Sequence, residues 1–111
     1  MNVPIYQTGC LSVAATIIMG AIGGHRKDWS ENQRETYHKA VFYQFMNSIG
    51  MIVASRSKSP KFSYTLFGMG IAFFCLPLYH KVLFQSEKYS SIPPLGGVSM
   101  IVGWIWLALM V

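Results

Sequence analysis

MNVPIYQTGCLSVAATIIMGAIGG, residues 1–24, contains no Asp, Glu, Lys or Arg, and three further stretches of the chain share this property. They are residues 40–55, 62–79 and 89–111, so every charged side chain lies in one of three short connections. A helix rises about 1.5 Å per residue, and roughly 17 to 25 apolar residues cross the hydrocarbon core of a bilayer. The sequence therefore predicts an all-α, polytopic membrane protein.

The four uncharged stretches predict a four-helix transmembrane bundle, built as a single domain over residues 1–111, with spans at about residues 5–24, 37–55, 62–80 and 94–111. The second stretch is the shortest, so its span is extended back to Tyr37, because the long side chain of Lys39 can reach the headgroups. So little chain remains outside the bilayer that a soluble catalytic or nucleic-acid-binding domain is excluded. The net charge of +5 is expected to meet anionic lipid headgroups.

Small residues recur at short intervals in the first and last spans, and we predict that both sets are helix-packing seams. Lipid provides little hydrophobic drive between helices, so association depends on the close backbone approach that small side chains allow. The predicted packing residues are Ser12, Thr16, Gly20 and Gly24 in the first span, and Gly96, Gly97, Ser99 and Gly103 in the last.

Two amides, Gln44 and Asn47, lie three residues apart in the second span and therefore share one helix face. Exposure of an amide to lipid is costly, so both are predicted to be buried polar residues that point inward. One interpretation is hydrogen bonding to Ser12, Thr16 or a backbone carbonyl of another span, at about 0.6 to 2 kcal/mol per bond. The alternative is a polar lining for the path of a small membrane carrier or channel.

Three local signals concern the ends of the spans. Trp29 predicts that the first connection lies at the membrane surface, and Ser30 with Gln33, or Asp28 with Glu31, can cap the start of a helix. Pro77 cannot donate a hydrogen bond to the carbonyl of the residue four positions earlier. The third span is therefore expected to kink or to end early at this proline.

Clusters of charged and metal-binding side chains suggest two sites. Arg56, Lys58 and Lys61 form a purely basic turn, which we predict contacts lipid headgroups and could hold a structural lipid such as cardiolipin. The four-span topology places three histidines at the opposite membrane face: His25, His38 and His80. A haem or metal site formed by them is the alternative hypothesis.

No enzymatic activity is predicted. The chain contains no phosphate-binding loop, no paired zinc-ligand spacing and no nucleophile elbow. Cys10 and Cys75 lie at different depths of parallel spans, about 7 and 20 Å from the same face, so a disulfide between them is not expected. No cofactor is expected either.

Several motifs resemble one known family, the small four-helix membrane proteins grouped as domain of unknown function 423, which includes eukaryotic transmembrane protein 256. The motifs are Gly20-Ala21-Ile22-Gly23-Gly24-His25, Tyr43-Gln44, Phe74 with Tyr79, and Pro94-Leu95-Gly96-Gly97-Val98-Ser99 followed by Gly103-Trp104. The last of these is the most specific. The resemblance covers nearly the whole chain and implies a four-span architecture rather than a mechanism.

The chain departs from the family pattern at two places. Asn47 stands where the family usually has a histidine, and Leu76 with Pro77 replace small residues. The resemblance therefore implies no role that needs an intramembrane histidine.

We expect the protein to be a non-catalytic accessory or structural subunit of a larger membrane complex. Its partners would be membrane lipids and other membrane-protein subunits, with no nucleic acid. The eukaryotic members of the resembling family imply a mitochondrial inner-membrane location and a respiratory-chain assembly.

Overall fold

The computed structural model describes residues 1–86, 88–89 and 91–110, and most of them are helical. The elements in chain order are α1 (Val3–Gly24), α2 (Glu31–Ala54), α3 (Pro60–Gly70), the π-helical turn η1 (Ile71–Cys75), α4 (Leu76–Phe84) and α5 (Pro93–Leu109). The described part of the chain contains no strand. The prediction of an all-α fold is confirmed, and α2 begins at Glu31, directly after Ser30, one of the cap residues that the sequence predicts.

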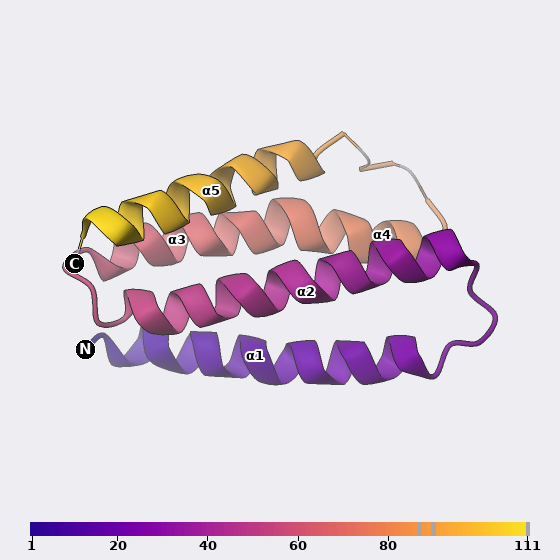
Figure 1. Ribbon diagram of the computed structural model, residues 1–111, viewed down its shortest axis with the longest axis horizontal. Helices are drawn as coiled ribbons and strands as arrows, with labels where there is room; N and C mark the ends of the chain where they lie inside the picture. Colours follow the sequence, from indigo (N-terminus) through magenta and orange to yellow (C-terminus); the bar gives the residue numbers. More distant parts are fainter. Residues whose placement is uncertain (87, 90, 111) are drawn as a thin grey trace.

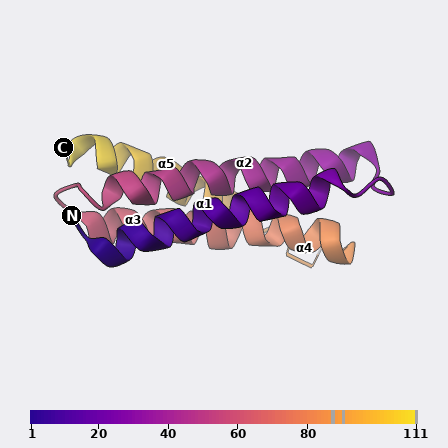
Figure 2. The ribbon, with the colours of Figure 1, turned by 90° about the horizontal axis from the view of Figure 1, so that it is seen from below.

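The helices lie side by side in nearly the order in which they occur in the sequence (Figure 1). The most extensive contacts join α1 to α2, α2 to the rod formed by α3, η1 and α4, and that rod to α5. Seen from below, α1 crosses the bundle obliquely, with α2 on one side and α3 on the other (Figure 2). The bundle is elongated, with extents of 45 × 26 × 17 Å, and α1 and α5 form its two outer edges.

Capping residues determine where the first two helices begin. The side chain of Asn2 accepts a hydrogen bond from the backbone N–H of Ile5 at the start of α1. At the start of α2, the N–H of Gln33 donates to the Ser30 hydroxyl, while the Gln33 side chain accepts from the N–H of Ser30. This reciprocal capping box, one of the two predicted for this connection, explains the early start of α2.

The connection before α2 is folded against the bundle. Trp29 is only 9% exposed and packs against Tyr37 with tilted rings, whose centroids are 4.8 Å apart. The Arg26 guanidinium lies over the Trp29 ring, and Arg34 donates to the backbone carbonyl of Arg26. The Trp29 ring thus completes the packing around Tyr37. The expectation that this connection lies at the membrane surface stays a prediction.

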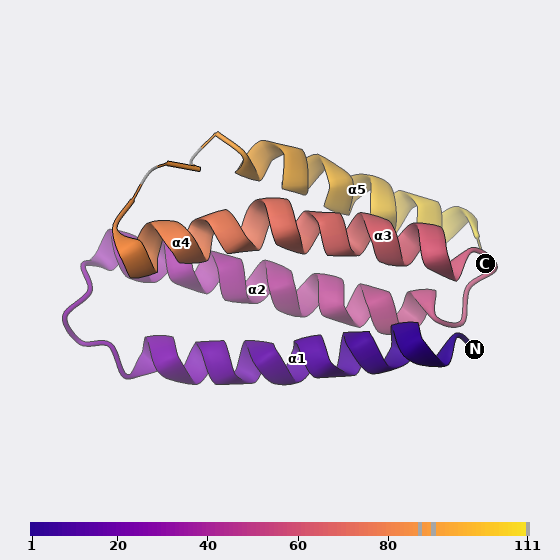
Figure 3. The same cartoon turned by 180° about the vertical axis from the view of Figure 1, so that it is seen from behind.

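Pro77 neither ends the third helix nor breaks it. α3, η1 and α4 form one continuous rod of 25 residues (Figure 3). In an α-helix the Phe73 carbonyl would accept from residue 77, which has no N–H. Just before the proline the helix widens into the π-helical turn, in which the N–H of Leu76 donates to the Ile71 carbonyl. The predicted early end is thus replaced by a local change of helix type.

The outer surface of the bundle is strongly apolar. Large apolar side chains on every α-helix are about 40 to 70% exposed, for example Ile17, Phe42, Leu76 and Ile101. Among the described residues, two helical segments are long and apolar enough to cross a membrane, Val3–Gly24 and Pro60–Phe84. Pro93–Leu109 is apolar but shorter.

Candidate functional site

The face of α1 that packs on α2 is lined by small residues, as the spacing predicts. The Ser12 hydroxyl lies 2.5 Å from the Ser48 hydroxyl of α2, and Thr16 is buried with its hydroxyl donating to the Val13 carbonyl of its own helix. Gly20 is half-buried, and a Cβ there would lie 3.9 Å from Val41.

Two glycines that the sequence analysis did not assign to the packing seam make the closest contacts of α1. A Cβ at Gly9 would lie 2.8 Å from the Ile52 side chain, and one at Gly23 would overlap the Tyr37 ring. Gly24 is exposed, and a Cβ there would meet open space. Gly23, not the predicted Gly24, therefore makes the close approach at this end of α1, because it lies on the face that contains Gly9 and Thr16.

A cluster of polar aromatic groups links α2 to α1 and α4 near the end of the bundle that holds the first connection. The Tyr79 hydroxyl of α4 donates to the Gln44 side-chain oxygen of α2 over 2.7 Å, and both residues are buried. The Tyr37 hydroxyl donates to the Met19 carbonyl of α1, and its ring meets that of Tyr79 edge-on at 5.3 Å. Gln44 therefore finds its partner in Tyr79 of α4, and not in Ser12, Thr16 or a backbone carbonyl of another span, which the sequence analysis named.

Asn47 is completely buried, one helical turn beyond Gln44. Its Nδ2 donates to the Tyr43 carbonyl of the same helix over 2.7 Å, while its Oδ1 is buried without a hydrogen-bond partner among the described residues. Both amides thus point inward, but neither meets Ser12 or Thr16. Ser12 pairs instead with Ser48, whose hydroxyl also donates to the Gln44 carbonyl.

The predicted seam of α5 packs on α3 and η1. A Cβ at Gly96 would lie 2.5 Å from the backbone nitrogen of Phe74, and one at Gly103 would lie 3.1 Å from the Phe67 ring. The Ser99 hydroxyl donates to the Leu66 carbonyl over 2.7 Å. Gly96 therefore lies directly against the backbone of the π-helical turn, where no side chain has room.

Gly97 has a different role from Gly96. A Cβ at this position would come no closer than 4.0 Å to Phe74. The residue lines an open groove of about 390 Å³ between α2 and α5. We call this the α2–α5 groove, and its other lining residues are apolar or aromatic: Tyr43, Met46, Phe74, Met100, Ile101, Trp104 and Ile105.

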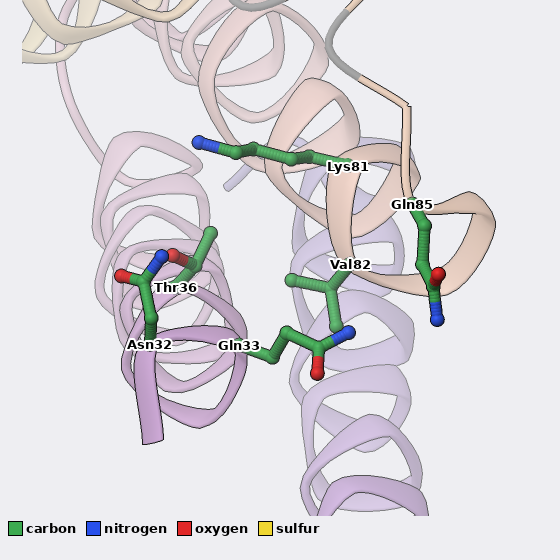
Figure 4. A pocket seen from close by; sticks show the side chains of 6 residues that line it. All are labelled: Asn32, Gln33, Thr36, Lys81, Val82 and Gln85. Atoms are coloured by element: carbon green, nitrogen blue, oxygen red, sulfur yellow. The ribbon is translucent and has the colours of Figure 1, made fainter. Parts of the chain in front are cut away.

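A second hollow, of about 330 Å³, lies between α2 and α4 near the first connection. It is lined by Asn32, Gln33, Thr36, Lys81, Val82 and Gln85 (Figure 4). In this view the Lys81 side chain extends across the hollow from α4, while the Asn32 and Thr36 side chains project from α2. The hollow is thus polar and lies at the charged end of the bundle, in contrast to the α2–α5 groove.

The three histidines of the metal hypothesis do not form one site. His25 and His38 are exposed, whereas the half-buried His80 packs between the rings of Phe84 and Tyr89, each at 5.0 Å. No three His, Cys, Asp or Glu side chains converge on a metal position among the residues that the structure describes. Cys10 is exposed and Cys75 is buried, and both thiols are free.

The basic turn lies at the opposite end of the bundle from the first connection. Arg56, Lys58 and Lys61 are all exposed there. The turn is close to both chain termini, which lie at the same end (Figure 1).

The family profile described as "Protein of unknown function (DUF423)" matches residues 19–97. A UPF0382 membrane protein of Staphylococcus aureus is 33% identical over 106 residues, which cover 89% of this chain and 87% of the relative. A UPF0382 membrane protein of Staphylococcus epidermidis is 30% identical, covering 91% and 88% of the two chains. One from Staphylococcus saprophyticus is 31% identical, covering 91% and 90%.

No solved structure matches the chain. The match to the family profile and the agreement with these relatives over nearly their full length are consistent with the apolar helices described above. The chain is a helical membrane protein and belongs to the DUF423 family.

Proposed function

We propose that the protein crosses the membrane four times and acts as a non-catalytic accessory subunit, which docks onto a larger membrane-protein assembly. The observation that carries this proposal is the α2–α5 groove. Its lining is apolar and aromatic, and it opens on the outer surface of the bundle, where Ile101 and Ile105 are about 60% exposed.

The lengths of the helices support four spans. α1 and the rod of α3, η1 and α4 reach about 33 and 37 Å, and α5 reaches about 26 Å, against a hydrocarbon core of about 30 Å. α2 is uncharged only over residues 40–54, about 22 Å of helix, so its first turns would lie in the headgroup region. The charged residues of those turns are Glu31, Arg34, Glu35 and Lys39.

The groove fits a transmembrane helix of a partner protein. Helices associate in lipid through small residues that permit close approach, and Gly97 offers such a position on the groove lining. Ile101 follows one turn later and would pack beside the incoming helix. A partner helix would thus cover apolar surface that the bundle itself leaves open.

The buried amides support the carrier alternative less well. Gln44 is 9% exposed and bonded to Tyr79, and Asn47 is completely buried. A substrate path would require groups that a solute can reach. We also predict, from the sequence alone, that the protein has no catalytic activity, binds no cofactor and binds no nucleic acid.

The relatives reported above are bacterial membrane proteins. They give no support to the expected mitochondrial inner membrane or to a respiratory-chain complex. We therefore propose docking onto a membrane-protein assembly and assign neither an organelle nor a complex.

Substitution of Gly97 by leucine tests the role of the groove. A side chain at this position meets Phe74 only at ordinary contact distance, so Gly97→Leu should fill the groove and leave the bundle folded. We expect the tagged wild-type protein, extracted in mild detergent, to migrate on a native gel in a complex with other membrane proteins. Gly97→Leu should reduce the recovery of those proteins at least fivefold, as measured by mass spectrometry.

The matched control is Val98→Leu, which changes the next residue of α5. Val98 is 59% exposed and does not line the groove. This variant should co-purify the same proteins as the wild type. Migration of the wild-type protein only as a monomer or small homo-oligomer would contradict the subunit proposal, and equal recovery with Gly97→Leu would contradict the role of the groove.

A further inference from the structure

The end of the bundle that holds the α2–α3 turn combines positive charge with a second apolar hollow. Arg56, Lys58 and Lys61 are exposed within six residues of sequence. All four acidic residues lie in the other two connections of the sequence: Asp28, Glu31, Glu35 and Glu87. The side chains of this turn therefore create a positive potential with no carboxylate side chain in the same connection to offset it.

Backbone hydrogen bonds hold this turn against the ends of α2 and α5. The N–H of Ser57 donates to the Ala54 carbonyl at the end of α2, and the N–H of Lys58 donates to the Met110 carbonyl after α5. The N–H of Asn2 donates to the Ser55 carbonyl. The cationic residues are thus carried by a segment fixed at several points, which lowers the entropy cost of presenting them to an anion.

A hollow of about 280 Å³ lies directly beside the turn, between the ends of α2 and α5. Val53, Leu107 and Met110 supply apolar surface, while Arg56 and Ser57 supply a polar rim. Val53 is 47% exposed, so this surface is open at the side of the bundle. The hollow is therefore amphipathic, with a guanidinium at its edge and aliphatic groups inside.

We propose that this end of the bundle binds an anionic phospholipid. Its phosphate would contact the guanidinium of Arg56 and the ammonium groups of Lys58 and Lys61. The first part of one acyl chain would lie in the hollow between Val53 and Leu107. This inference rests on the four-span arrangement proposed above, because that arrangement places the turn at the level of the headgroups.

The chemistry of the hollow favours a lipid over a soluble anion. An Arg guanidinium binds phosphate oxygens in a bidentate manner, and clusters of basic residues at the membrane surface attract anionic lipids. A free anion would gain nothing from the aliphatic surface next to the guanidinium. A phospholipid matches the hollow in both respects, because its phosphate would lie at the polar rim and its acyl chain against the apolar surface.

Native mass spectrometry of the full-length protein in detergent tests the proposal. The protein is incubated with phosphatidylglycerol and phosphatidylcholine of identical acyl chains, and the bound lipids are counted. We expect preferential retention of phosphatidylglycerol by the wild type, and a loss of this preference by about tenfold in the triple variant Arg56→Gln/Lys58→Gln/Lys61→Gln. The control Lys27→Gln/Lys39→Gln/Lys88→Gln removes the same charge at the other end and should keep the preference.

A second variant tests the hollow without changing any charge. Val53→Trp would fill the apolar part and should lower phosphatidylglycerol retention, whereas Ile49→Trp, one turn earlier on α2, should not. Unchanged preference in the triple variant, or unchanged phosphatidylglycerol retention in Val53→Trp, overturns the proposal. Carbonate extraction of membranes separates this failure from that of the four-span arrangement, since a released protein would contradict the arrangement and a retained one would leave it intact.

Discussion

The hydrogen bond between Tyr79 and Gln44 joins the polar cluster of α2 to α4. A buried amide oxygen in an apolar bundle costs free energy unless a donor reaches it. The hydroxyl at the tip of Tyr79 provides that donor, and the edge-on contact between Tyr37 and Tyr79 orients the ring. The hydrogen bond that the buried amide requires thus links α2 to α4.

Tyr79→Phe should destabilise the bundle by about 1 to 2 kcal/mol, because the variant leaves the Gln44 oxygen buried without a donor. The measurement is the free energy of unfolding in mixed micelles titrated with a denaturing detergent. Tyr6→Phe, at a residue that is 40% exposed, should change it little and serves as the control. Adding Gln44→Leu to Tyr79→Phe should recover part of the loss; full additivity of the two changes would contradict the pairing.

At this scale the sequence predicts burial better than it predicts partners. The cost of an amide in lipid places Gln44 and Asn47 inside on residue type alone, and the structure buries both. The donor to Gln44 comes from Tyr79, 35 positions later in the sequence. Which side chain arrives there depends on the rotation of α4 about its axis, which no local spacing determines.

At the scale of the elements, the fit between η1 and α5 follows from Pro77 and Gly96 together. The proline favours a widened turn before it, and the glycine allows α5 to contact the backbone of that turn. The sequence predicts a disturbance at Pro77 and a packing glycine in the last span. It does not predict that they meet, because the π-helical turn shifts the faces of the helix that follows.

Gly96→Ala should separate α5 from the π-helical turn, because its Cβ would overlap the backbone of Phe74, which cannot move aside as a side chain could. We expect a loss of about 1 to 3 kcal/mol in the free energy of unfolding, as for other overpacked sites. The adjacent Gly97→Ala has room for its Cβ and should be neutral or slightly stabilising, since alanine favours helix. Equal effects of the two substitutions would show that α5 does not pack in this register.

At the scale of the whole molecule, the fold places the α2–α3 turn at one end and the α1–α2 connection at the other. The number and order of the helices follow from charge segregation in the sequence, since uncharged stretches of this length have few alternatives to helices in lipid. The lateral arrangement is harder to predict, because four helices can pack in several orders with similar burial of apolar surface.

The four-span arrangement predicts that residues 27 and 59 lie on opposite sides of the membrane. In a Cys10→Ser background, Lys27→Cys and Ser59→Cys should react with a membrane-impermeant maleimide from opposite faces of sealed vesicles. Both should react after detergent solubilisation, which controls for burial. Labelling of both positions from the same face would rule out an odd number of crossings by α2.

The neighbour relations of the helices also bear on biosynthesis. Because α1 packs chiefly on α2, and each later segment packs on one that precedes it, no helix has to wait for a distant partner. A nascent chain leaving the ribosome could close the first hairpin before α3 is translated, and then add the remaining helices at one growing side. Truncated forms that end after α2 should therefore already hold a native-like helical pair during insertion.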